Sequence, residues 1–115
     1  MKIEIIAPEV AATAQEVKIR VVLFNDSYEP VEISRNAFIG PTVQAVNPPG
    51  SPHPEGVEAT FGGPEEPLML QSFCFYGRER TFNSTTPGEF QVTARYCHGN
   101  KHDLSAVKRL LVKPA

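Results

Sequence analysis

The sequence predicts an all-β fold, a two-sheet sandwich of seven to nine mostly antiparallel strands. Three observations favour it: apolar and polar residues alternate over short segments, turn residues divide these segments about every 8–12 positions, and no long helical period is present. The 115 residues include 11 prolines and 8 glycines. Because a proline inside a helix costs about 3 kcal/mol, this distribution excludes a helical bundle. Two packed sheets require strands that each bury one face, and a small closed barrel is the less favoured alternative.

Residues 17–24 form the clearest strand of the first half. Every second side chain from Val17 to Leu23 is apolar, which places these side chains on one face of a strand. Residues 8–18 could instead begin with a single helical turn. The other strands expected in this half are residues 2–6, 31–33, 42–46 and 57–61.

The clearest alternation of the second half is from Phe90 to Tyr96, where every second side chain is again apolar. The last strand is expected at residues 106–113. Its orientation stays open, because Val107 and Leu110 fit opposite faces.

A strongly apolar run covers residues 68–75 and continues past Gly77 to Phe82. Phe73 and Phe75 share one face, whereas Phe82 has the opposite parity. A bulge or a strand break at Gly77 would bring all three rings into one core.

Two segments carry a family resemblance. Residues 22–31, an apolar strand followed by Asn, a small polar turn and Pro-Val, are similar to the crossing between the B and C strands of a sandwich. Residues 86–96, with Pro-Gly before an aromatic residue, look like the corner between the E and F strands. The chain thus resembles the immunoglobulin-like and fibronectin-type-III-like domains, particularly small bacterial ones. This implies one sandwich domain over residues 1–115.

The sequence departs from that family at two places. Many members have a Tyr whose hydroxyl bonds back to the corner's backbone, but Phe90 stands here, so the bond is absent or made by another group. No Trp is present, and the first strand of the family's disulfide lacks a Cys. Cys74 and Cys97 are expected as two reduced thiols on outer faces or beneath a loop, and a disulfide between them would require Cα atoms within about 7 Å.

A narrower resemblance is to the bacterial intracellular proteinase-inhibitor domain, a compact sandwich with a similar Asn-turn-Pro start and a Pro-Gly-aromatic late strand. No inhibitory residue can be matched to this sequence. The resemblance therefore makes proteinase inhibition an alternative function without naming a site for it.

Composition excludes several function classes. The net charge of −2 gives no basic field for nucleic acid, and no apolar run reaches the roughly 18 residues of a membrane span. No secretory signal is visible at the start of the chain, so a cytoplasmic location is expected, although a leaderless exported chain would begin the same way.

The densest group of metal-ligating residues lies at residues 97–103. Cys97, His98 and His102 are weak candidate ligands, because their spacing matches no standard zinc pattern and a polar hairpin explains them equally well. A catalytic Cys–His pair is disfavoured, since neighbouring residues of a strand point to opposite faces. We therefore expect no enzyme activity and no cofactor.

Two sets of residues are the best candidates for binding. Residues 47–56 contain four prolines and form a stiff loop with Pro48, Pro49 and His53. The second set, Tyr76, Arg78, Arg80 and Arg95, has the residue types common at binding hot spots, with a solvated strand face as the alternative.

Taken together, the sequence predicts a non-catalytic module that binds a protein or peptide, alone or as an accessory part of a larger assembly. Proteinase inhibition is the alternative function, and metal binding through residues 97–103 is less favoured. Self-association through an exposed edge strand is a further prediction.

Overall fold

The computed structural model describes residues 1–47, 49–52, 66–98 and 102–115. Within these ranges the chain forms ten strand segments and no helix, so the all-β prediction is confirmed. No described segment is a helix of the length and hydropathy needed to span a membrane. The expected strand at residues 57–61 lies outside the described residues.

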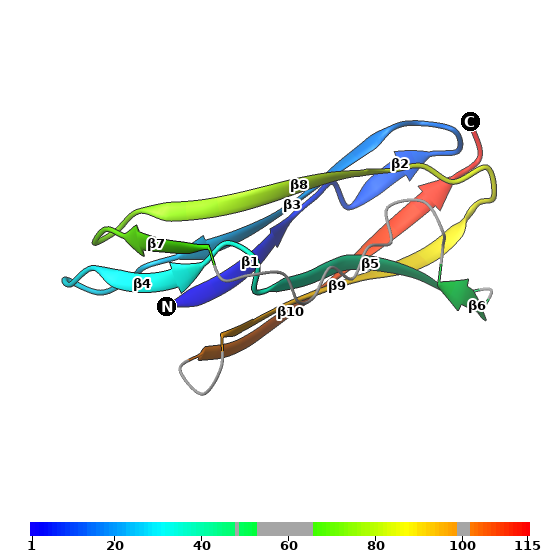
Figure 1. Ribbon diagram of the computed structural model, residues 1–115. Helices are drawn as coiled ribbons and strands as arrows, with labels where there is room; N and C mark the ends of the chain where they lie inside the picture. Colours follow the sequence, from blue (N-terminus) through cyan, green and yellow to red (C-terminus); the bar gives the residue numbers. More distant parts are fainter. Residues whose placement is uncertain (48, 53–65, 99–101) are drawn as a thin grey trace.

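One layer of the sandwich is a three-stranded antiparallel sheet. It consists of β1 (Lys2–Ile6), β3 (Val17–Phe24) and β8 (Phe75–Phe82), in the order β1-β3-β8 (Figure 1). The expected strands at residues 2–6 and 17–24 are therefore confirmed, and the alternating apolar side chains of β3 are buried as its pattern predicts.

The other layer is a five-stranded sheet in the order β2-β10-β9-β5-β6 (Figure 1). Its strands are β2 (Val10–Ala12), β5 (Phe38–Asn47), β6 (Pro49–Pro52), β9 (Gly88–His98) and β10 (His102–Lys113). All pairs are antiparallel except β2 with β10.

The helical turn considered within residues 8–18 does not form. Residues of β2 instead pair in parallel with the end of β10, with Val10 beside Leu111. The amide of Leu111 donates to the carbonyl of Glu9 at 2.9 Å. Pairing with β10 gives the backbone N–H and C=O groups of β2 hydrogen-bond partners that a single helical turn would not supply.

A third, two-stranded sheet lies at one end of the sandwich, formed by β4 (Val31–Ser34) and β7 (Pro67–Leu70) (Figure 1). The phenolic oxygen of Tyr96 on β9 accepts a hydrogen bond from the Ser34 amide at 2.9 Å. This buried bond ties the small sheet to the five-stranded sheet.

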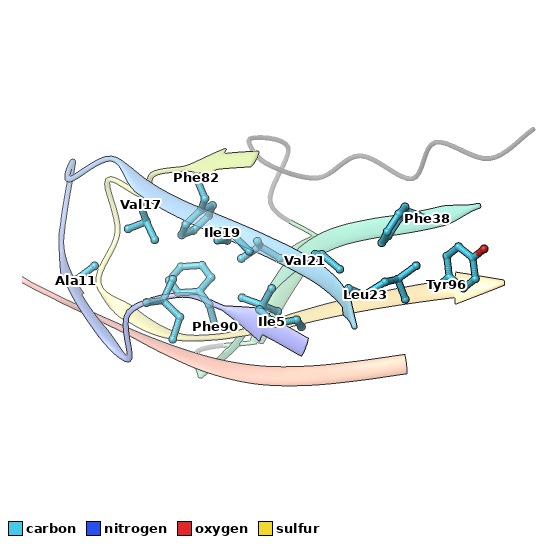
Figure 2. Close-up of a cluster of buried hydrophobic side chains, with 14 of the residues drawn as sticks. Ile5, Ala11, Val17, Ile19, Val21, Leu23, Phe38, Phe82, Phe90 and Tyr96 are labelled. Atoms are coloured by element: carbon cyan, nitrogen blue, oxygen red, sulfur yellow. The ribbon is translucent and has the colours of Figure 1, made fainter. Parts of the chain in front are cut away.

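The core lies between the two main sheets, and Figure 2 shows side chains of β3 and Phe82 facing Phe90, Phe38 and Tyr96. The rings of Phe82 and Phe90 are 5.3 Å apart and nearly edge to face. The expected burial of alternate residues from Phe90 to Tyr96 is confirmed.

The orientation of β10 is settled by its pairing with β9. Leu110 lies opposite the buried Phe90 and is 1% exposed, whereas Val107 is 63% exposed. The even-numbered side chains from Leu104 to Val112 therefore face the core.

The expected break at Gly77 is wrong. β8 pairs with β3 without a register shift, from Phe82 opposite Val17 to Phe75 opposite Phe24. The break lies earlier, at residues 71–74, where Phe73 has a φ of 57°. Phe73 and Phe75 are consequently 50% and 66% exposed rather than in the core.

Candidate interaction surface

A buried asparagine joins two turns that are distant in sequence. The Nδ2 group of Asn25 donates to the carbonyls of Glu29 at 2.8 Å and Leu70 at 3.0 Å. Its Oδ1 atom accepts hydrogen bonds from the amide and the hydroxyl of Ser27. Asn25 is fully buried, so these bonds are shielded from water.

The backbone completes the connection between the turns. The Asn25 amide donates to the Cys74 carbonyl at 2.9 Å, and the Phe73 amide donates to the Asn25 carbonyl at 2.8 Å. The Ser72 hydroxyl donates to the Ser27 carbonyl at 2.6 Å. Residues 25–30 and 71–74 therefore form one fixed unit.

This unit and the adjoining start of β8 present aromatic side chains to solvent. Tyr28, Phe73 and Phe75 are 88%, 50% and 66% exposed, and we call these three residues the aromatic end. The rings of Tyr28 and Phe73 meet edge to face at 5.0 Å. Phe75 lies opposite the half-buried Phe24, whose ring is 5.7 Å from the Lys2 ammonium.

The sequence pattern did not predict the aromatic end. The shared parity of Phe73 and Phe75 favoured a place in the core, and Tyr28 was expected only as part of a turn. A local signal was present, because Asn-Asp-Ser at residues 25–27 is typical of a turn held by side-chain hydrogen bonds. The local pattern does not predict that Asn25 also binds a second turn, residues 71–74, which is distant in the sequence.

Three of the predicted binding residues lie together on β8. Tyr76, Arg78 and Arg80 share the half-buried face of the strand that points toward the other sheet. The Tyr76 ring is 6.0 Å from the ring of Phe38, and the Arg78 guanidinium carbon is 5.8 Å from the same ring. Glu79 points to the opposite face, where it pairs with the guanidinium of Arg20 at 3.2 Å.

Arg95 lies apart from this group, on the outer face of the five-stranded sheet. Its guanidinium donates two hydrogen bonds to Asp103 on β10, both of 2.8 Å. The pair raises the pKa of Arg95 and lowers the pKa of Asp103, chiefly through these hydrogen bonds. A shallow groove of about 320 Å³ adjoins it, with Thr42, Thr93 and Val107 in its lining.

The predicted proline-rich surface is only partly described. Pro48 and His53 lie outside the described residues. Pro49 begins β6, where its backbone lies opposite Val46 of β5.

The structure describes the side chains of Cys97 and His98, whereas the side chain of the third candidate metal ligand, His102, lies outside what it describes. Among the described side chains, no group of three His, Cys, Asp or Glu is placed to hold a metal ion. Cys97 and His98 have opposite parity on β9, and both Cys74 and Cys97 are free thiols. The backbone of His102 pairs with His98 at the start of β10.

The corner before β9 is held by hydrogen bonds of Ser84, where many members of the resembled family use a Tyr hydroxyl. The buried Ser84 hydroxyl donates to the Thr86 carbonyl at 2.8 Å and accepts from the Thr86 amide at 3.1 Å. The Ser84 carbonyl accepts a further hydrogen bond from the Ala14 amide at 2.7 Å. A serine hydroxyl thus holds the corner before Phe90.

Comparison with known proteins supports the fold. No family model and no curated protein sequence matches the chain. The CARDB domain of the PF1109 protein from Pyrococcus furiosus, solved in complex with di-metal ions, is similar with a TM-score of 0.58. The two are 13% identical, and the match covers 99% of this chain and 93% of that one.

Two further structures are more distant. The PapD-like domain 7 of human CEP192 has a TM-score of 0.41 at 15% identity, with 99% of this chain and 85% of that chain covered. A β-glucosidase from Listeria innocua has a TM-score of 0.48 at 11% identity, covering 96% of this chain but 16% of the enzyme. The similarity to the CARDB domain shows that this chain has the fold of an immunoglobulin-like sandwich.

Proposed function

We propose that this chain is a non-catalytic, cytoplasmic module that binds a protein or peptide partner through the aromatic end. The proposal depends on the exposure of Tyr28 and Phe73, which lie on two turns joined by Asn25, and of Phe75, which lies at the adjoining start of β8. Exposed apolar side chains that cluster on a soluble domain typically belong to an interaction surface.

The physical character of the aromatic end supports this role. Aromatic side chains contribute large contact areas with few rotatable bonds, and they are enriched at binding hot spots. A surface already fixed before binding loses little conformational entropy on association. Immunoglobulin-like domains often serve as non-catalytic interaction modules, which agrees with the proposal at the level of the fold.

The test compares partner capture by three purified forms of the chain. The Phe73→Asn/Phe75→Thr variant removes two rings while keeping residues suited to their backbones, since Asn tolerates a positive φ and Thr favours strands. Val107→Thr is the matched control, because Val107 is 63% exposed on the other sheet.

We expect a stoichiometric partner from the source lysate to bind the native chain and the control, and to be lost from the double variant. Binding to the purified partner should then weaken at least about tenfold in that variant alone. Equal capture by all three forms would exclude the aromatic end as the binding surface. A peptidase as the captured partner, inhibited stoichiometrically, would favour the inhibitor alternative.

A further inference from the structure

The two turns of the aromatic end carry acidic but no basic side chains. Residues 25–30 include Asp26 and Glu29, and residues 71–74 include no charged residue. Asp26 is already paired, since its carboxylate lies 2.6 Å from the ammonium group of Met1. The Glu29 carboxylate is exposed and forms no ion pair or hydrogen bond within the part of the chain that the structure describes. Glu29 is therefore an uncompensated charge beside exposed rings.

The backbone of Glu29 is fixed next to those rings. Its carbonyl accepts hydrogen bonds from Asn25 Nδ2 at 2.8 Å and from the Ser27 hydroxyl at 3.0 Å. Glu29 directly follows Tyr28, whose ring meets that of Phe73 at an interplanar angle of 86°. An exposed carboxylate and two exposed rings are thus arranged before a partner binds.

A cation is the chemical group that satisfies both features. The face of an aromatic ring attracts a cation that lies within about 6 Å of its centroid. The neighbouring Phe24, which lies opposite Phe75, already shows this contact, because its centroid is 5.7 Å from the Lys2 ammonium. A guanidinium is planar and has five N–H donors, so it can stack on a ring and pair with a carboxylate at the same time.

We propose that the partner places an arginine side chain on the aromatic end. Its guanidinium stacks on the ring of Tyr28 or Phe73 and pairs with the Glu29 carboxylate. An apolar partner that covered Tyr28 would take water away from Glu29 without supplying a counter-charge, which is unfavourable. This inference rests on the proposed function and specifies the chemistry of the partner.

A second copy of this chain fits the aromatic end less well. Two aromatic ends that met would bring two uncompensated Glu29 carboxylates into one interface, where like charges repel. Lys2, the basic residue of the adjoining strand β1, is already placed over Phe24. Charge complementarity therefore favours a partner with an exposed arginine over self-association at this end.

The test uses a blocked five-residue peptide with arginine at its centre and leucine on either side. The matched peptide has citrulline at the centre, which has nearly the same shape but no charge. In an amide NMR titration of the native chain, the arginine peptide should shift the signals of residues 25–30 and 71–74. The citrulline peptide should bind at least about threefold more weakly. Equal affinities, or no binding of either peptide, would overturn the proposal.

Protein variants test the carboxylate and the ring. Glu29→Gln should remove the preference for arginine over citrulline, and Tyr28→Ser should weaken binding of the arginine peptide at least about threefold. Glu9→Gln is the matched control, because Glu9 is also exposed but directly precedes β2, which lies at the opposite end of the sandwich from β4 and β7 (Figure 1). Equal melting temperatures would show that the losses are not unfolding. A preference for arginine that persists in Glu29→Gln would refute the pairing.

The same variant separates this inference from the proposed function. Binding of the purified partner should weaken at least about threefold in Glu29→Gln and stay unchanged in Glu9→Gln. If partner capture depends on Phe73 and Phe75 but not on Glu29, the proposed function stands and this inference fails.

Discussion

The side chain of Asn25 joins two turns that are more than 40 residues apart in sequence. It is fully buried, and it forms hydrogen bonds with Ser27 and with the backbone carbonyls of Glu29, Leu70 and Gln71. A buried polar side chain of this kind fixes the local backbone, because removing it leaves several backbone groups without partners. The positions of the exposed Tyr28 and Phe73 therefore depend on Asn25, a residue that is itself too deeply buried to contact a partner.

Asn25→Ala should lower the free energy of unfolding by about 2 kcal/mol, since the buried carbonyl of Leu70 and the part-buried carbonyls of Glu29 and Gln71 would lose their donor. Urea denaturation monitored by circular dichroism measures this. Asn83→Ala is the control, because Asn83 is exposed, and it should stay within about 0.5 kcal/mol. Similar small losses for both variants would show that the Asn25 hydrogen bonds do not hold the turns.

The ion pair between Arg95 and Asp103 predicts how the pKa of the Asp103 carboxyl responds to a substitution. Arg95 lowers the pKa of Asp103, so the ion pair favours the folded state above the carboxyl's unfolded pKa, and this contribution is lost as pH falls through the lowered folded pKa. In Arg95→Gln the pKa of Asp103 should rise toward its ordinary value. Titration of the Asp103 carboxyl carbon by NMR measures it, and an unchanged pKa would contradict the pairing. Because both side chains are exposed, the effect on overall stability should be small.

At the scale of an element, β5 contains a bulge that sequence alternation does not predict. The pairing of β5 with β9 shifts register between Ile39 and Thr42. Gly40 lies in this bulge with a φ of 93°, and a Cβ atom there would lie 2.9 Å from both the Thr42 amide nitrogen and the Thr93 carbonyl oxygen. The strand expected at residues 42–46 is thus the second part of a longer element, Phe38–Asn47.

Gly40→Ala should destabilise the fold by about 2 kcal/mol or more, because backbone atoms on both sides block the new methyl group and φ is positive. Gly77→Ala is the comparison. Its nearest contacts are ordinary or slightly tight at 3.3 Å, so a change below about 1 kcal/mol is expected. Thermal unfolding of the two variants in parallel measures the difference, and equal losses would refute the role of the bulge.

At the scale of the whole molecule, the two sheets expose different kinds of side chain. The three-stranded sheet carries Phe75 of the aromatic end, whereas the outer face of the five-stranded sheet carries the paired Arg95 and Asp103. The sequence placed Arg95 with Tyr76 as one set of binding residues. The topology separates them, because parity assigns residues to faces within a strand but not to one sheet or the other.

By itself, the sequence determined the fold class and the strongest strands. In β3 and β9 every second side chain is apolar, and a period of two can bury those side chains only in a strand with one face on a core. The same pattern was insufficient for Phe73, which lies in a distant turn bonded to Asn25, and for Phe75, which lies on the exposed face of β8. Which strands pair with one another was likewise decided only by the tertiary structure. Pairing depends on which segments meet in space, and no local period along the chain encodes that.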